Sequence, residues 1–192
     1  ISGITNDKVN IYYNNNKINC DTFDKYIDLY LDNEIKIYEK INDRWEVGVT
    51  VSTSDKYENY SFVNGIATFK GGKHVDYITK QITSKLSEYI NKKHKQVVPE
   101  NYIKNYLKIF INSVIVNPSF DSQTKERLIT PQSKFGSKAL ISDKFIEKMA
   151  NELDIISRVL LFAEFKQTKE AQKNNGSKVK RINVPKLDDA NN

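Results

Sequence analysis

The chain has 192 residues, 39% hydrophobic and 28% charged, and no stretch approaches the roughly eighteen apolar residues that a membrane-spanning helix needs. This length is enough to bury one large core with appendages, which argues against disorder throughout. A single cysteine and two histidines exclude an internal disulfide and make a metal site unexpected. The formal net charge of +6 suggests an acidic partner, most commonly nucleic acid.

Alternating apolar and polar residues predict the clearest strand, which begins at Trp45. Trp45, Val47, Val49 and Val51 fall on one side of it, a pattern with the period of a half-buried strand. Segments rich in Ile, Val, Phe and Tyr predict further strands. These cover Glu34 to Ile41, Tyr57 to Val63 and Leu107 to Val116, with a weaker candidate at Val9 to Tyr13.

A long helix is predicted between Gly71-Gly72 and Asn91. Its apolar residues recur three or four positions apart and form one buried face: Val75, Ile78, Ile82, Leu86, Tyr89 and Ile90. The glycines suit the helix start, and Asn91 with the lysines after it suits the end, where cations meet the negative pole of the helix dipole.

Two further helices, or one bent helix, are predicted after Ser142. Ser142 is a candidate cap for the first and Asp154 for the second, whose apolar residues run to Phe165. The apolar pattern stops after Lys169, and the residues from Asn174 onward indicate a flexible link. Strands and helices mix without strict alternation, so an α+β fold is predicted, with a mixed sheet, helices packed on one face and a long C-terminal helix.

Four blocks of sequence carry a family resemblance that covers nearly the whole chain. Residues 117–126 read Asn-Pro-Ser-Phe-Asp-Ser-Gln-Thr-Lys-Glu, and this string resembles a signature loop of eukaryotic-type DNA topoisomerase II. Residues 44–47, residues 61–77 and residues 185–191 agree with the same family in order. The chain begins at Ile1 rather than at a methionine, so we expect a piece of a longer protein.

The resemblance implies the transducer domain, which is similar to the second domain of ribosomal protein S5 and lies between a GHKL ATPase domain and the TOPRIM region. We expect residues 1–141 to form its core, residues 142–172 its C-terminal helices and residues 173–192 a linker toward TOPRIM. The implied whole enzyme is a nuclear, homodimeric, ATP-dependent type II topoisomerase that passes one DNA duplex through another. The chain alone is expected to be inactive.

Lys125 resembles the lysine that the family brings to the phosphates of ATP. A cation held there would stabilise charge that gathers during phosphoryl transfer. The resemblance also assigns nucleotide contacts to Gln123 and Thr124, and it implies Mg²⁺ in the full enzyme, with ligands outside this chain. Without the surrounding match, Gln-Thr-Lys would be an ordinary solvated loop.

Asn91, Lys92, Lys93 and Lys95 lie where the family places a basic loop that contacts double-stranded DNA. Lysines can touch phosphates there without reading bases. The competing interpretation is a solubilising helix end. Lys73 and His74 are explained equally well by packing, and the charged run from Lys173 to Arg181 by solvation.

Two other functions remain open from the sequence. One is a stand-alone nucleic-acid-binding module with the S5-like fold, and the other is the middle domain of a different GHKL ATPase. At one position local rules and the family disagree: Asn64-Gly65 is typical of a tight turn, whereas the matching blocks around it favour a continuous strand or a bulge. We follow the family there.

Overall fold

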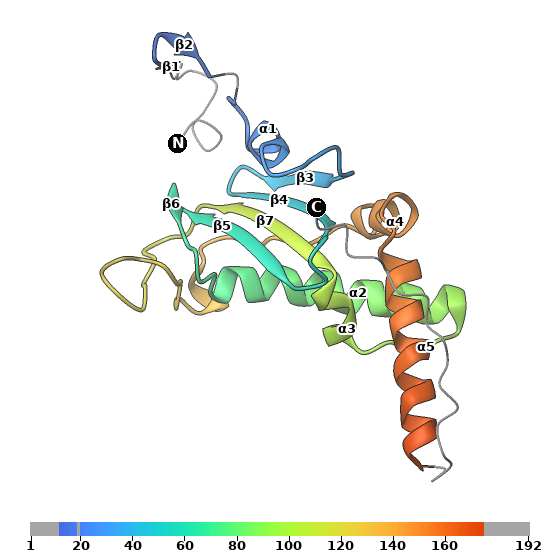
Figure 1. Cartoon of the computed structure of the whole chain (residues 1–192). Helices are drawn as coiled ribbons and strands as arrows, with labels where there is room; N and C mark the ends of the chain where they lie inside the picture. The colour runs from blue at the N-terminus through green and yellow to red at the C-terminus, as the bar shows by residue number, and fades with distance from the viewer. Residues whose placement is uncertain (1–11, 19, 175–192) are drawn as a thin grey trace.

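The computed structural model describes residues 12–18 and 20–174, so the proposed linker beyond Asn174 and the block at 185–191 lie outside the described residues. A five-stranded sheet in the order β3-β4-β7-β5-β6 is the centre of the fold (Figure 1). Its strands are β3 (Ile37–Asn42), β4 (Trp45–Val51), β5 (Glu58–Val63), β6 (Ile66–Ala67) and β7 (Leu107–Ser113). Near the N-terminus, β1 (Tyr12–Tyr13) and β2 (Asn16–Lys17) form a separate hairpin.

The sheet is mixed, as predicted. β7 pairs antiparallel with β4, Trp45 opposite Ser113, and parallel with β5, Val63 opposite Ser113. Parallel neighbours need a long crossover. Here it consists of β6, α2 (Lys73–His94) and α3 (Glu100–Asn105).

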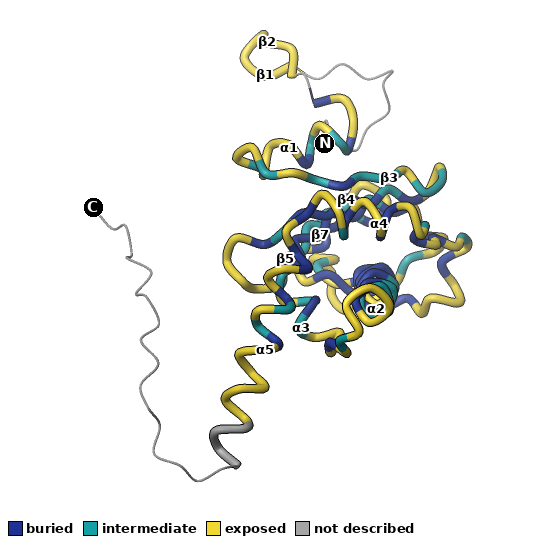
Figure 2. Tube along the Cα trace, turned by 90° about the vertical axis from the view of Figure 1, so that its right-hand side faces the viewer, coloured by how far each residue is buried: buried dark blue, intermediate teal, exposed yellow. Residues whose placement is uncertain are grey.

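Helix α2 covers one face of the sheet, as Figure 2 shows. The predicted apolar face is confirmed, because Val75, Ile78, Ile82, Leu86 and Ile90 are buried, and Tyr89 is partly buried against the same core. The strands contribute side chains from alternate positions: Val47, Val49, Ile109 and Ile111. Burial of each large side chain stabilises the fold by about 1.5–3 kcal/mol before entropy is counted.

The prediction that helices cover one face only was wrong. Helix α1 (Phe23–Asp28) lies on the opposite face, where Phe23 and Ile27 pack against Phe110 in a second cluster. The sequence permits this because residue 48 is glycine: a Cβ there would lie 2.4 Å from Ile27 Cδ1. The helix is too short to show an apolar period.

The expectation of a continuous strand or bulge at residues 64–65 was also wrong, and the local turn rule was right. β5 and β6 form a tight hairpin in which Val63 pairs with Ile66. Asn64 has φ 51° and Gly65 φ 79°, the positive angles that Asn-Gly adopts in such turns. The Asn64 amide also bonds Ile115, accepting from its N–H at 2.8 Å and donating to its carbonyl at 3.0 Å. These bonds hold the backbone just beyond β7, which ends at Ser113, so the predicted strand to Val116 was too long.

Two separate helices follow Ser142, which caps the first by accepting a hydrogen bond from Phe145 N at 3.1 Å. They are α4 (Asp143–Glu152) and α5 (Ile155–Asn174), divided at Leu153, whose backbone is extended. A short 3-10 helix, η2 (Gln132–Lys134), precedes them. None of the helices in the described ranges combines the length and apolarity needed to cross a bilayer.

His74 is fully buried in the first turn of α2. Burial lowers the pKa of its imidazole to about 3, far below the ordinary value near 6.5. Between about pH 6.5 and pH 3, His74 is therefore protonated in the unfolded chain and neutral in the folded chain. The stability from the neutral ring is fully present above about pH 6.5 and is lost as the pH falls from there toward 3.

We predict that His74→Gln removes this pH dependence. Between about pH 6 and pH 4, the wild-type chain should lose stability relative to the variant by about 1.4 kcal/mol per pH unit. Urea unfolding at several pH values measures the difference. The control His94→Gln changes an exposed imidazole on the same helix. The prediction would be contradicted if the free energy of unfolding of the wild type changed with pH in parallel with that of His74→Gln.

Candidate functional site

The residues from Asn117 to Pro131 form a loop whose tip carries Gln123, Thr124 and Lys125, all exposed. Lys125 closes a turn, donating its backbone N–H to Ser122 O at 3.1 Å with φ at 59°. The hydroxyls of Ser122 and Thr124 lie 2.8 Å apart across this turn. Among the described residues, neither the Gln123 amide nor the Lys125 ammonium has a hydrogen-bond or ion-pair partner. The tip therefore presents an amide and a cation outward.

The stem of the loop is a narrow ribbon. Phe120 and Leu128 form an antiparallel bridge. Asp121 N donates to Arg127 O at 3.1 Å, and Ile129 N donates to Ser119 O at 2.9 Å. These cross-bonds restrict the directions in which the tip can swing.

The stem is joined to the start of α2. Leu128 N donates to Gly71 O at 3.1 Å, and Lys73 N donates to Leu128 O at 3.0 Å. Lys70 N donates to Glu126 O at 2.9 Å, and the side chains of Lys70 and Glu126 form an ion pair. The residue next to Lys125 is thus bonded to the turn that precedes α2.

Gly72 makes this junction possible. Its φ is 134°, and a Cβ at residue 72 would lie 2.3 Å from Leu128 O and 2.5 Å from Leu128 N. No backbone atom can accept such an overlap, so only glycine fits. The predicted role of the Gly71-Gly72 pair was to begin a helix. Its contact with a segment more than fifty residues away was missed, and the unusual glycine pair was the only signal for it.

The second group of predicted residues lies at the other end of α2. Asn91, Lys92 and Lys93 are exposed in its last turn, and Lys95 is the left-handed residue that ends the helix. The predicted end at Asn91 was therefore too early, and Lys92 and Lys93 belong to the helix rather than to a loop. A 22-residue helix is roughly 33 Å long, so the structure does not bring this cluster near Lys125.

The lysines of this cluster have different surroundings. Lys93 Nζ lies 3.1 Å from the Tyr89 hydroxyl and above the Tyr89 ring. The pKa of the Asp143 carboxyl is held below its ordinary value, first by its hydrogen bond from Lys85 and to a smaller extent by the charge of Lys92. Part of the positive charge is therefore balanced within the chain, and the exposed ammonium groups face solvent.

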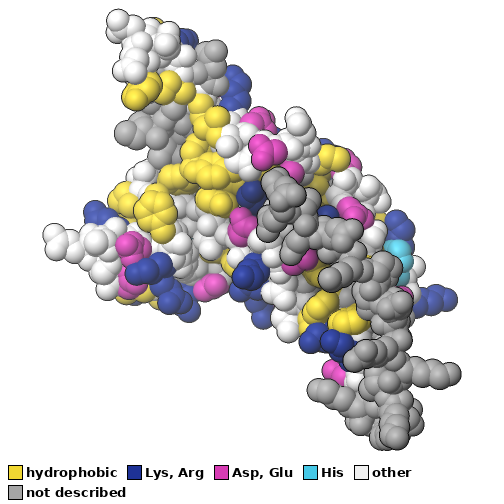
Figure 3. Space-filling view, viewed as in Figure 1, with side chains coloured by type: hydrophobic (Ala, Val, Ile, Leu, Met, Phe, Trp, Pro, Cys, Tyr) yellow, Lys and Arg dark blue, Asp and Glu magenta, His cyan; other side chains and the backbone are white. Residues whose placement is uncertain are grey.

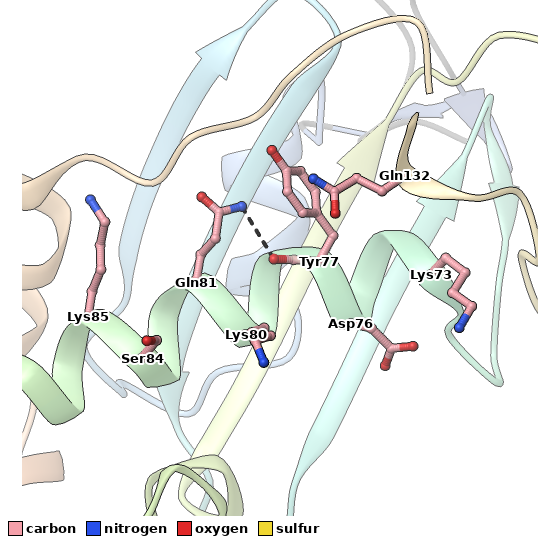
Figure 4. A pocket seen from close by; sticks show the side chains of 8 residues that line it. All are labelled: Lys73, Asp76, Tyr77, Lys80, Gln81, Ser84, Lys85 and Gln132. Carbon is pink, nitrogen blue, oxygen red and sulfur yellow. Dashed lines mark hydrogen bonds between the residues drawn. The ribbon is translucent and has the colours of Figure 1, made fainter. Parts of the chain in front are cut away.

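A groove of about 530 Å³ runs along α2, and two of its polar side chains, Gln81 and Lys85, are used to hold the chain together. Figure 4 shows the side chains of Lys73 and Lys80 pointing away from Gln132. Gln81 donates to Ala139 O at 2.9 Å, and Lys85 donates to Ile141 O at 2.8 Å. These bonds fasten the segment before α4, and they leave the Lys125 loop as the stronger candidate site.

The described residues contain no group of three His, Cys, Asp or Glu side chains placed to hold a metal ion. The two carboxylates beside Lys125 have partners of their own. Glu126 pairs with Lys70, and Asp121 accepts a hydrogen bond from Ser122 at 3.3 Å.

Comparison with known proteins gives consistent results. The family model for DNA gyrase B matches residues 7–178. DNA topoisomerase 2 of Arabidopsis thaliana is 43% identical across 99% of this chain, and DNA topoisomerase 2-alpha of Homo sapiens is 41% identical across 100% of it. The chain spans only 13% of the length of each of these relatives.

Solved structures agree. The ATPase region of Saccharomyces cerevisiae topoisomerase II superposes with a TM-score of 0.77 and 42% identity, over 85% of this chain and 42% of that one. A structure of the ATPase and transducer domains of DNA topoisomerase II from Balamuthia mandrillaris superposes with a TM-score of 0.76 and 40% identity, over 83% of this chain and 40% of that one. The chain therefore belongs to the DNA gyrase B family and corresponds to part of the ATPase region of a type II DNA topoisomerase.

Proposed function

We propose that this chain is the transducer part of an ATP-dependent type II topoisomerase, with the S5-like fold, and that it donates Lys125 to the phosphates of ATP bound by a neighbouring GHKL domain. The observation that carries the proposal is the geometry of the loop: a cation with no partner in the part of the chain that the structure describes, at an exposed tip, on a stem bonded to the start of α2. Residues 1–141 form the proposed core and residues 142–172 the helices that extend from it. Residues 173–192 form the proposed linker toward TOPRIM.

Lys125 would act by electrostatics. Phosphoryl transfer spreads negative charge over the transferred group, and a positioned cation stabilises that charge without waiting for water to reorganise. Gln123 would contact the same phosphates through its amide, and Thr124 would hold the turn between them. The Mg²⁺ that accompanies ATP is assigned to the GHKL domain, because the carboxylates of this loop already have partners.

An exposed apolar face next to this loop supports the proposal that a second domain packs there. A hollow of about 470 Å³ over β5, β6 and α1 is lined by aromatic rings, including Tyr26, Tyr60 and Phe62. Phe69, on its rim, is 79% exposed. Figure 3 shows hydrophobic side chains running from the β1–β2 hairpin to this face, next to the loop. A contiguous apolar patch of this kind marks an interaction surface.

Because Lys125 and the nucleotide belong to different bodies, their contact forms only in a closed arrangement. Nucleotide would then favour closure by the free energy of that contact, on the order of 1–3 kcal/mol. We propose that α4 and α5 pass this change to the DNA-cleaving part of a nuclear homodimer, which couples ATP turnover to duplex passage.

We predict that Lys125→Ala lowers the ATPase turnover of the whole enzyme strongly while the fold is kept. The exposed ammonium contributes little to stability, and its loss removes stabilisation of the transition state. Steady-state ATPase assays test this, with Lys134→Ala as a control at another exposed lysine. Gln123→Ala should act in the same direction with a smaller effect. Equal ATPase rates for Lys125→Ala and wild type would contradict the proposed contact between Lys125 and the phosphates.

We predict that Lys92→Ala, Lys93→Ala and Lys95→Ala together weaken DNA binding about equally for all sequences, because phosphate contacts carry no base information. Each lost contact should flatten the slope of log affinity against log salt by roughly 0.9. The control replaces three other exposed lysines, Lys56, Lys134 and Lys138, with the same loss of charge. If the slopes of log affinity against log salt were identical for the two triple variants, the cluster would be only a solvated helix end and not a DNA contact.

A further inference from the structure

Three buried polar side chains lie directly beneath the turn that holds the Lys125 loop. Ser61 is on β5, Thr68 follows β6, and His74 is in the first turn of α2; their exposed fractions are 4%, 0% and 0%. The Thr68 hydroxyl lies 2.6 Å from the Ser61 hydroxyl and 3.2 Å from His74 Nε2. It also donates to Ser61 O at 2.9 Å. The three side chains form one continuous network.

Counting protons gives a consistent set of donors and acceptors for this network. The Ser61 carbonyl can only accept, so it takes the Thr68 hydroxyl proton. The Ser61 hydroxyl then supplies the proton for its 2.6 Å contact with Thr68 Oγ1, and it also lies 3.0 Å from Thr68 O. Thr68 Oγ1 is then left to accept, and His74 donates to it from Nε2. His74 Nδ1 has no partner in the described chain, which fits an unprotonated nitrogen and a neutral ring.

The network is bonded to the backbone that carries the loop. Thr68 N donates to Ser61 O at 2.7 Å, and Thr68 O accepts from Gly71 N at 2.9 Å. Thr68 is therefore held from both sides at the start of the turn, and His74 holds the other end from within α2. Between them lie Lys70, Gly71 and Gly72, the residues that contact the loop stem at Glu126 and Leu128.

We propose that the Ser61–Thr68–His74 network is a positioning device for Lys125, which acts by fixing the turn at residues 68–73 on which the loop hangs. The proposal rests on the assigned role of Lys125 in ATP turnover. None of the three side chains would touch nucleotide. The stem of the loop is bonded to this turn, so the turn sets where the tip can lie. Misplacement of a catalytic group by about 1 Å can cost up to a hundredfold in rate.

The test uses three variants. Thr68→Val removes the central hydroxyl at nearly constant volume, and Thr68→Ser retains it. Thr79→Val is the matched control. Thr79 is a buried threonine of α2, away from the loop, and its hydroxyl lies 2.8 Å from the Tyr57 hydroxyl. Thr68→Val leaves the Ser61 hydroxyl and His74 Nε2 without this partner, and Thr79→Val does the same to the Tyr57 hydroxyl. Both variants should lose stability, Thr68→Val by more, so kcat is compared at a temperature at which both are folded.

In the whole enzyme we expect Thr68→Val to lower the kcat of the ATPase roughly ten- to hundredfold, with little change in the KM for ATP. Thr68→Ser should restore most of the rate, and Thr79→Val should keep the wild-type kcat. Combined with Lys125→Ala, Thr68→Val should cause no further loss, because it acts through that lysine. An equal loss in both backgrounds, or a wild-type kcat for Thr68→Val, would overturn the proposal.

Amide hydrogen exchange on the present chain provides a readout that does not depend on ATP. Thr68→Val should speed exchange at the N–H groups of Lys73 and Leu128, which bridge the turn and the stem, and Thr79→Val should not. Equal protection at these amides in the two variants would overturn the positioning role. If Lys125→Ala alone leaves ATPase activity unchanged, the proposed function fails; if it lowers activity but Thr68→Val adds to it independently, only this inference fails.

Discussion

The close approach of Gly72 to the backbone of Leu128 is the contact on which the candidate site depends. A side chain at residue 72 would overlap backbone atoms of Leu128 at 2.3 and 2.5 Å, so the stem can approach the start of α2 this closely only because residue 72 is glycine. Hydrogen bonds on both sides of the contact then fix the stem. An exposed lysine thereby gains a defined position without being buried, and its charge stays available to a ligand on another body.

Helix α2 gives the molecule its working geometry. The Lys125 loop is bonded to the N-terminal end, the basic cluster lies at the C-terminal end, and the apolar face between them is packed into the core. If both proposed roles hold, one packed helix separates the nucleotide contact from the DNA contact by roughly 33 Å.

The sequence was sufficient where local periodicity and burial coincide. The strand from Trp45 to Val51 and the buried face of α2 were predicted because alternation and helical spacing report directly on the core. Asn64-Gly65 followed local turn chemistry, and the family-based expectation there was wrong. Helix α1 and the contact between Gly72 and Leu128 were not predicted, because each depends on segments that are distant in sequence and leave no periodic signal. The residues of the loop were identified by resemblance alone, since their proposed ligand lies outside this chain.

The central claim is that Lys125 reaches the phosphates of a nucleotide held by a neighbouring domain. Photo-crosslinking with an ATP analogue that carries its reactive group on the γ-phosphate tests it directly in the whole enzyme, followed by mass spectrometry of the labelled peptides. The account predicts that label within this chain falls on the loop tip around Gln123 and Lys125, and that excess ATP suppresses it. Label that consistently spares this loop while marking the ATP-binding domain would contradict the account.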